Sequence, residues 1–179
     1  MRGKWLSLVA ALTVTAIGCG QGRAIFDIDV FSFLSSAKAD TLPYVGPLPP
    51  GFPDTIPPQT VNSLGIGSSS IVDTVHFTGS VDFENATGTG NVTFAVYFDS
   101  LQSTLYSGTP AINVSAAVTP GTTTPSPFDI PNLTDPALRQ LFLKSTVYVG
   151  IRVSTTGTIS GVARLSALRA RIVIQDKFF

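Results

Sequence analysis

The chain has 179 residues, with 11 basic and 11 acidic side chains, and 44% of its residues are hydrophobic. Balanced charge and the lack of a basic domain or an RNA-binding motif argue against a nucleic-acid partner. A single cysteine excludes an internal disulfide framework and a cysteine-based zinc site. Plentiful Gly, Pro and Phe with few strong helix formers favour strands and turns. We therefore expect one all-β domain without a cofactor.

The first 19 residues are laid out like an export signal. Arg2 and Lys4 give a positive start, residues 5–17 are mostly apolar, and Gly18 leads to the only cysteine, Cys19. The apolar run is too short to span a bilayer, which takes about 20 residues. This layout resembles the signal peptide and lipobox of bacterial lipoproteins.

That resemblance implies that residues 1–18 are removed and that Cys19 is lipidated, becoming the first residue of a membrane-held mature chain. Gly20 stands where an Asp would imply retention in the inner membrane. The resemblance therefore implies export to the outer membrane, on its periplasmic or surface face. An ordinary secretory signal, which would release the protein, is the alternative.

Charge is segregated along the mature chain. Residues 19–138 carry two basic and ten acidic side chains, whereas residues 139–179 carry seven basic and one acidic. In a compact domain the two parts are expected to pair with each other. The alternative is a bipolar surface that steers a partner.

Residues 19–42 are predicted to hold the lipidated N-terminus and a first element that packs on the domain. Apolar side chains at positions 26, 28 and 30 alternate with Asp27 and Asp29, as in a strand. Phe31, Phe33 and Leu34 then break the alternation, so the pattern leaves strand and helical turn open.

Residues 43–58 contain seven prolines and are predicted to form extended chain outside any sheet interior. Tyr44, Phe52 and Ile56 are apolar, which favours packing along the domain surface. A stiff spacer and a ligand for a proline-binding partner are the alternatives.

Residues 59–179 are predicted to form the sandwich itself. Inward apolar rows at 75–83 and 92–98 flank the turn-like residues 85–91, which indicates a long hairpin. A strand over 111–118, a loop over 119–127, a short helix capped by Asp135 and a strand over 147–153 follow.

In the last strand the apolar side chains change parity, so a bulge is expected near Ser166 and Ala167. The whole pattern predicts a single antiparallel β-sandwich, immunoglobulin-like, with about seven strands and one short crossover helix. A small barrel is the alternative fold.

Charged side chains are predicted to share the outward face and to pair across strands. The members of this expected salt-bridge face are Asp82, Glu84, Asp99, Arg152, Arg164, Arg169 and Arg171. The acids among them could instead serve a carboxylate-based glycoside hydrolase or a calcium site. Pairing with the arginines is favoured, so no catalytic or metal residue is predicted. The only histidine, His76, has no nucleophile motif near it.

Three functions follow from these patterns. The first is a non-enzymatic, lipid-anchored envelope protein with a structural or protein-interaction role. The second is a polysaccharide- or small-ligand-binding module, with Tyr97 and Tyr148 as rings on which sugars stack. The third is a glycoside hydrolase. The expected partners are the membrane, through Cys19, and an envelope protein or polysaccharide.

Overall fold

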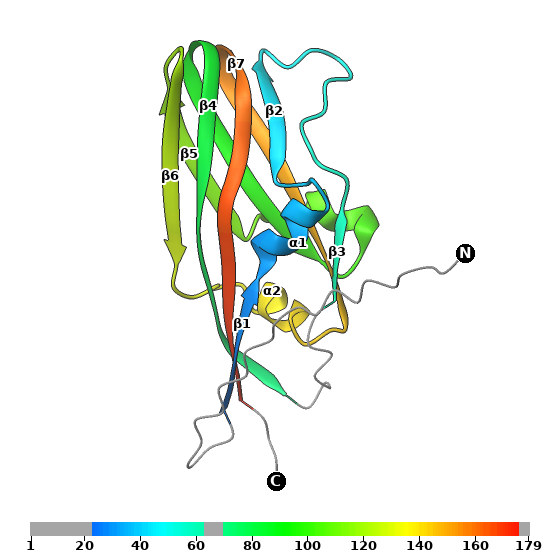
Figure 1. Ribbon diagram of the computed structural model, residues 1–179. Helices are drawn as coiled ribbons and strands as arrows, with labels where there is room; N and C mark the ends of the chain where they lie inside the picture. The colour runs from blue at the N-terminus through cyan, green and yellow to red at the C-terminus, as the bar shows by residue number, and fades with distance from the viewer. Residues whose placement is uncertain (1–22, 63–69, 176–179) are drawn as a thin grey trace, which may run out of the picture.

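The computed structural model describes residues 23–62 and 70–175. The signal-like segment and Cys19 lie outside the described residues. Strands dominate the described part, and Figure 1 shows how they are arranged. The elements in chain order are β1 (Arg23–Asp29), α1 (Val30–Ser36), β2 (Thr41–Gly46), β3 (Gln59–Asn62), β4 (Ile71–Asp99), the 3₁₀ helix η1 (Gln102–Ser107), β5 (Ile112–Val118), β6 (Thr122–Ile130), α2 (Pro136–Leu141) and β7 (Thr146–Gln175).

One antiparallel sheet of seven described strands folds over into two layers (Figure 1). The long strands β4 and β7 pair with each other along almost their whole length and run through both layers. In the first layer β6 joins β4, while β1 and β2 join β7. In the second layer β5 joins β4 and β3 joins β7. The predicted all-β antiparallel sandwich is confirmed.

The predicted hairpin around residues 85–91 is wrong. The strand does not pair with itself there, but continues as β4 and bends from one layer into the other. Ala86 is the extra residue of a bulge, and Gly88 has a φ of 75°, a conformation that glycine adopts without steric cost. Asn85, only 2% exposed, holds the bend by donating to the Gly88 carbonyl oxygen at 2.8 Å and accepting from the Tyr44 hydroxyl at 3.2 Å.

Strand β6 replaces most of the loop predicted over residues 119–127. It contains Pro125 and Pro127, yet it pairs only with β4 and so lies at a sheet edge. An edge strand tolerates proline, because one side of the strand needs no amide donors. The same reasoning explains Pro43 in β2, which pairs only with β7.

The bulge predicted from the change of parity in the last strand is confirmed. Ser80 pairs with Ala167, but Val81 pairs with Leu165, so Ser166 is the extra residue. The Ser166 hydroxyl donates to the Ser80 carbonyl oxygen at 3.1 Å. Apolar side chains on both sides of the bulge therefore face the core.

The core lies between the two layers and is closed by the helices. Residues 24–42 contain both elements that their pattern allowed, a strand followed by a helix, and Val30 and Leu34 of α1 are buried. Asp135 caps α2, as predicted. The largest fully buried side chains include Phe77, Phe83, Phe94, Ile151, Leu165 and Ile172. None of the described helices is long and apolar enough to cross a membrane.

Candidate functional site

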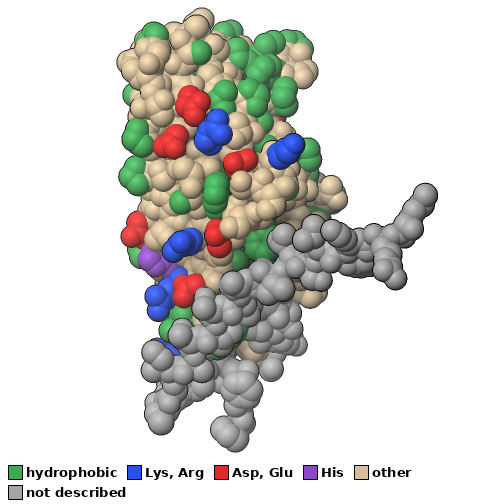
Figure 2. Space-filling view, in the orientation of Figure 1, with side chains coloured by type: hydrophobic (Ala, Val, Ile, Leu, Met, Phe, Trp, Pro, Cys, Tyr) green, Lys and Arg blue, Asp and Glu red, His purple; other side chains and the backbone are tan. Residues whose placement is uncertain are grey.

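Charged side chains gather on the outer face of the first layer, where β1, β7, β4 and β6 lie side by side. Figure 2 shows blue, red and purple side chains together on the lower half of this face. The register places them in two rows across the strands. Arg171 lies between Asp27 and His76 in one row, and Arg169 lies between Asp29 and Thr78 in the next.

Local hydrogen bonds decide which of these charges are paired. Asp29 is the N-cap of α1 and accepts from the Ser32 amide at 3.2 Å and from the Ser32 hydroxyl at 2.7 Å. His76 Nε2 lies 2.6 Å from an Asp129 carboxylate oxygen. These contacts engage Asp29 and His76, whereas Asp27, directly across from Arg171, forms no ion pair with it within 4.0 Å.

Arg169 and Arg171 both lack an ion pair among the described residues. Within the described ranges, neither guanidinium lies within 4.0 Å of a carboxylate oxygen. Both side chains are exposed and point to the same side of β7, about 7 Å apart along the strand. We call the recess that they line the arginine groove. It has a volume of about 580 Å³ and is lined by Asp27, Ile28, Asp29, His76, Thr78, Arg169 and Arg171.

The upper part of the same face is paired. Arg164 Nε donates to Glu84 Oε1 at 3.1 Å, and Asp82 lies directly across the strands from Arg164. This pair joins the acidic first part of the chain to the basic last part. Exposed pairs of this kind contribute about 0–1 kcal/mol each, so they help to set register more than stability.

Arg152 and Asp99 do not belong to this face. Because β4 and β7 cross from one layer to the other, side chains of outward parity lie on two opposite outer faces. Arg152 lies on the second layer, 3.8 Å from a carboxylate oxygen of Asp54. The predicted single salt-bridge face is therefore divided, and Asp99 has no arginine partner among the described residues.

Asp99 instead fixes the start of η1. It accepts from the Leu101 amide at 3.1 Å and from the Thr104 hydroxyl at 2.8 Å. Burial opposes ionisation, but these bonds and those from Ser100 outweigh it and hold the pKa of the Asp99 carboxyl below its usual value. A carboxylate engaged in this way supports the local fold.

The open stacking ring expected at Tyr97 is wrong, because η1 covers this part of the second layer. Leu105 and Tyr106 pack on Tyr97, which is only 8% exposed, and Tyr148 is partly buried beside them. The Arg152 guanidinium lies 5.5 Å from the Tyr97 ring centroid and 5.0 Å from that of Tyr106. The cluster therefore anchors η1 and leaves no platform for a sugar ring.

Burial also raises the pKa of the Tyr106 phenol to about 12. This phenol donates to the carbonyl oxygen of Ile56, in the proline-rich segment. The same cluster thus ties that segment to the second layer, which agrees with surface packing of the segment.

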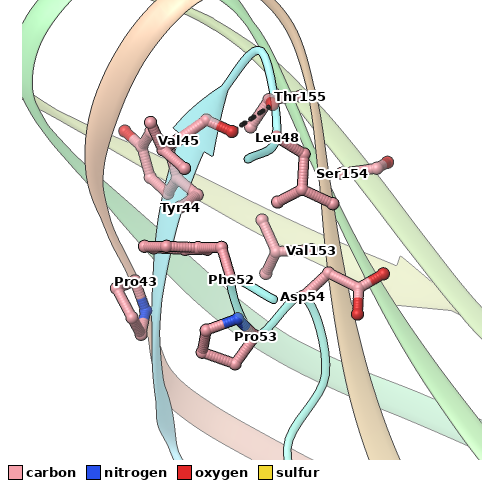
Figure 3. A pocket seen from close by; sticks show the side chains of 10 residues that line it. All are labelled: Pro43, Tyr44, Val45, Leu48, Phe52, Pro53, Asp54, Val153, Ser154 and Thr155. Atoms are coloured by element: carbon pink, nitrogen blue, oxygen red, sulfur yellow. Dashed lines mark hydrogen bonds between the residues drawn. The ribbon is translucent and has the colours of Figure 1, made fainter. Parts of the chain in front are cut away.

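A second hollow lies where the proline-rich segment meets β2 and β7 (Figure 3). Its side chains come from Pro43, Tyr44, Val45, Leu48, Phe52, Pro53, Asp54, Val153, Ser154 and Thr155. Its volume of about 140 Å³ is below the range of about 300–1,000 Å³ typical of ligand sites, whereas the arginine groove falls within it. We therefore regard the small hollow as a packing seam, closed by the Thr155 hydroxyl donating to the Val45 carbonyl oxygen at 3.0 Å.

The sequence reasoning missed two partners in these contacts, Asp54 and Asp129. Asp54 lies in the segment predicted to be extended outside any sheet, and Asp129 lies between the loop predicted over 119–127 and the predicted helix cap at Asp135. No alternation indicated where either side chain would point. A signal was present for Asp29, because an Asp three residues before Ser32 at a helix start is a typical N-cap. In the described part of the chain, no group of three or more His, Cys, Asp or Glu is placed to hold a metal ion.

No family model matches this chain, and no curated protein matches it. Among solved structures it is similar to infectious bursal disease virus, Gx strain, with 15% identity and a TM-score of 0.42 over 92% of this chain and 38% of that chain. The T13 particle of the same virus gives 14% identity and a TM-score of 0.41, over 86% of this chain and 35% of that chain. The CBM22-1–GH10 modules of Clostridium thermocellum xylanase 10B, complexed with xylohexaose, give 12% identity and a TM-score of 0.33. That match covers 77% of this chain and 26% of that chain. The chain spans less than half of each of these proteins, and at such low similarity no functional residue is transferred.

Proposed function

We propose that this protein is a non-enzymatic, lipid-anchored β-sandwich of the cell envelope that acts by binding a partner. The observation that carries the proposal is the N-terminal pattern of basic start, apolar run and Gly18-Cys19. Acyl chains on Cys19 would hold the mature chain at the outer membrane. Several chains give stable attachment, whereas one gives only marginal attachment.

The short connection between the anchor and the fold supports this proposal. Only three residues separate Cys19 from Arg23, where β1 begins. Four chain steps span at most about 14 Å, so an anchor at Cys19 would keep the Arg23 end of β1 close to the bilayer. Arg23 itself lies 3.5 Å from the Asp73 carboxylate, so this end is part of the fold.

A binding role rather than catalysis is supported by how the titratable groups are used. Glu84 is bonded to Arg164, and Asp99 holds the start of η1. General acid or base catalysis needs a carboxyl or imidazole within hydrogen-bond reach of a reacting group. Groups committed to such contacts are better suited to fixing the fold.

The anchor is tested by expressing the wild type and Cys19→Ala and separating membranes from soluble material. We expect the wild type in the outer-membrane fraction and Cys19→Ala released from it. Cys19→Ser is a matched variant, because it keeps the size of the side chain but not the thiol that is acylated. Membrane association of either variant at the wild-type level would refute the proposal.

A further inference from the structure

We infer that the arginine groove binds an acidic polysaccharide through paired contacts from Arg169 and Arg171 to its carboxylate groups. This names the partner class of the proposed binding role and rests on that proposal. The site differs from the two tyrosines first considered for sugar binding, which η1 covers.

The inference rests on Arg169 and Arg171 being exposed and without an ion-pair partner. Each guanidinium has five donors in a planar fork that matches a carboxylate, and both forks are exposed with no carboxylate partner within 4.0 Å in the described chain. Asp29, which the register sets opposite Arg169, is occupied by Ser32. The groove therefore presents donors whose natural complement is an anion.

The other lining groups favour a sugar over a protein segment. Thr78 offers a hydroxyl, and Asp27 offers a carboxylate that can accept from sugar hydroxyls. Ile28 is the only apolar side chain in the lining. Protein interfaces rely on buried apolar and aromatic anchors at their centre, and this groove gives such an anchor no place.

The location of the groove favours a polymer over a lipid headgroup. Asp27 is four residues beyond Arg23 along β1, so the groove begins about 13 Å from the end at which the proposed anchor attaches. That distance exceeds the Debye length of about 8 Å at physiological salt. The groove also crosses three neighbouring strands, β1, β7 and β4, which suits a chain laid across it.

The test compares the mature protein in nonionic detergent with its variants by isothermal titration with polygalacturonate. We expect binding that weakens with added salt, and an affinity loss of about tenfold or more in the double variant Arg169→Ala/Arg171→Ala. Arg164→Ala is the matched control, since Arg164 is on the same strand and face but is bonded to Glu84. It should change the affinity by less than about twofold, as surface pairs contribute little.

A gain of affinity gives a second readout that no misfolding can imitate. Asp27→Asn removes the negative charge across from Arg171 but keeps an acceptor oxygen for a sugar hydroxyl, so it should tighten binding of polygalacturonate by a few-fold. Neutral dextran of similar length should not bind any of the proteins, because it lacks the carboxylates.

Four results would overturn the inference. They are no binding of polygalacturonate, equal affinity of wild type and the double variant, an equal loss in Arg164→Ala, and tighter binding of phosphatidylglycerol micelles than of the polysaccharide. The intact mass of the same preparation shows separately whether Cys19 is acylated. Acylation without binding would refute the groove alone, and binding without acylation would refute the anchor alone.

Discussion

Replacing Asn85 by alanine should destabilise the bend by which β4 passes between the layers. Asn85 makes two hydrogen bonds there, to the Gly88 carbonyl oxygen at 2.8 Å and from the Tyr44 hydroxyl at 3.2 Å, and it is only 2% exposed. Each bond is worth about 0.5–1.5 kcal/mol net, and a buried group left without a partner costs about 1–3 kcal/mol. We expect a loss of about 2–3 kcal/mol.

The loss is measured by urea unfolding followed by far-UV circular dichroism. In a domain of this size it corresponds to a fall in Tm of about 5–10 °C. Tyr44→Phe should cost about 1 kcal/mol, because it removes one of the two bonds but keeps the ring in the core. In a double-mutant cycle the two changes should be non-additive by about 0.5–1 kcal/mol.

Asn91→Ala is the matched control, because Asn91 lies on the same strand but its side chain is exposed. It should change the stability by less than about 0.5 kcal/mol. Equal effects of Asn85→Ala and Asn91→Ala would refute the role assigned to Asn85, and so would strict additivity with Tyr44→Phe.

Three further substitutions test the bend of β4 at Gly88, the aromatic cluster around Tyr97 and the dependence of stability on pH. Gly88→Ala should cost about 3 kcal/mol or more by thermal unfolding, because the φ is positive and a Cβ would overlap the Thr158 carbonyl oxygen; a cost under about 1 kcal/mol would contradict this. Arg152→Ala should cost about 1–2 kcal/mol in urea by removing cation–π contacts to Tyr97 and Tyr106, and Arg152→Lys should restore part of it. The raised pKa of Tyr106 adds stability that is complete below pH 10 and is lost as pH rises to about 12. Tyr106→Phe should therefore reduce the slope of the stability profile across that window, and the rest of the slope comes from Tyr44, whose pKa burial also raises to about 12. An unchanged slope would contradict the buried Tyr106 phenol.

Much of the fold could be predicted because the inward side chains of β4 and β7 alternate between the bulges. Val75, Phe77 and Phe83 are fully buried, as their parity indicated, and the change of parity located the bulge at Ser166. Alternation is local in the sequence, since it reports which face of a strand meets the core.

The path of β4 could not be predicted in the same way. Residues 85–91 are rich in Gly, Asn and Thr, which suits both a hairpin turn and a bend with a bulge. What distinguishes them is the pairing of Gly88 with Ile159, about 70 residues away in the chain. This long-range pairing divided the predicted charged face, so that Arg152 lies on one outer face and Arg164 on the other.

For the arginine groove, parity correctly placed Arg169 and Arg171 on an outward face but could not show whether they were paired. That depends on the N-cap at Asp29 and on the bond between His76 and Asp129, which requires β6 to lie beside β4. The sequence also did not show that η1 covers Tyr97, because the residues of η1 have no periodic apolar pattern. Leu105 and Tyr106, two large apolar residues six and seven positions after Asp99, were its sequence signal.

The account depends most on the N-terminus of the mature protein, which intact-mass and peptide mass spectrometry of membrane-extracted material measures directly. We predict that the N-terminal peptide begins at Cys19 and carries the added mass of acyl chains. An N-terminus at any other residue, or an unmodified Cys19, would contradict the proposal that this β-sandwich is held at the membrane by a lipid.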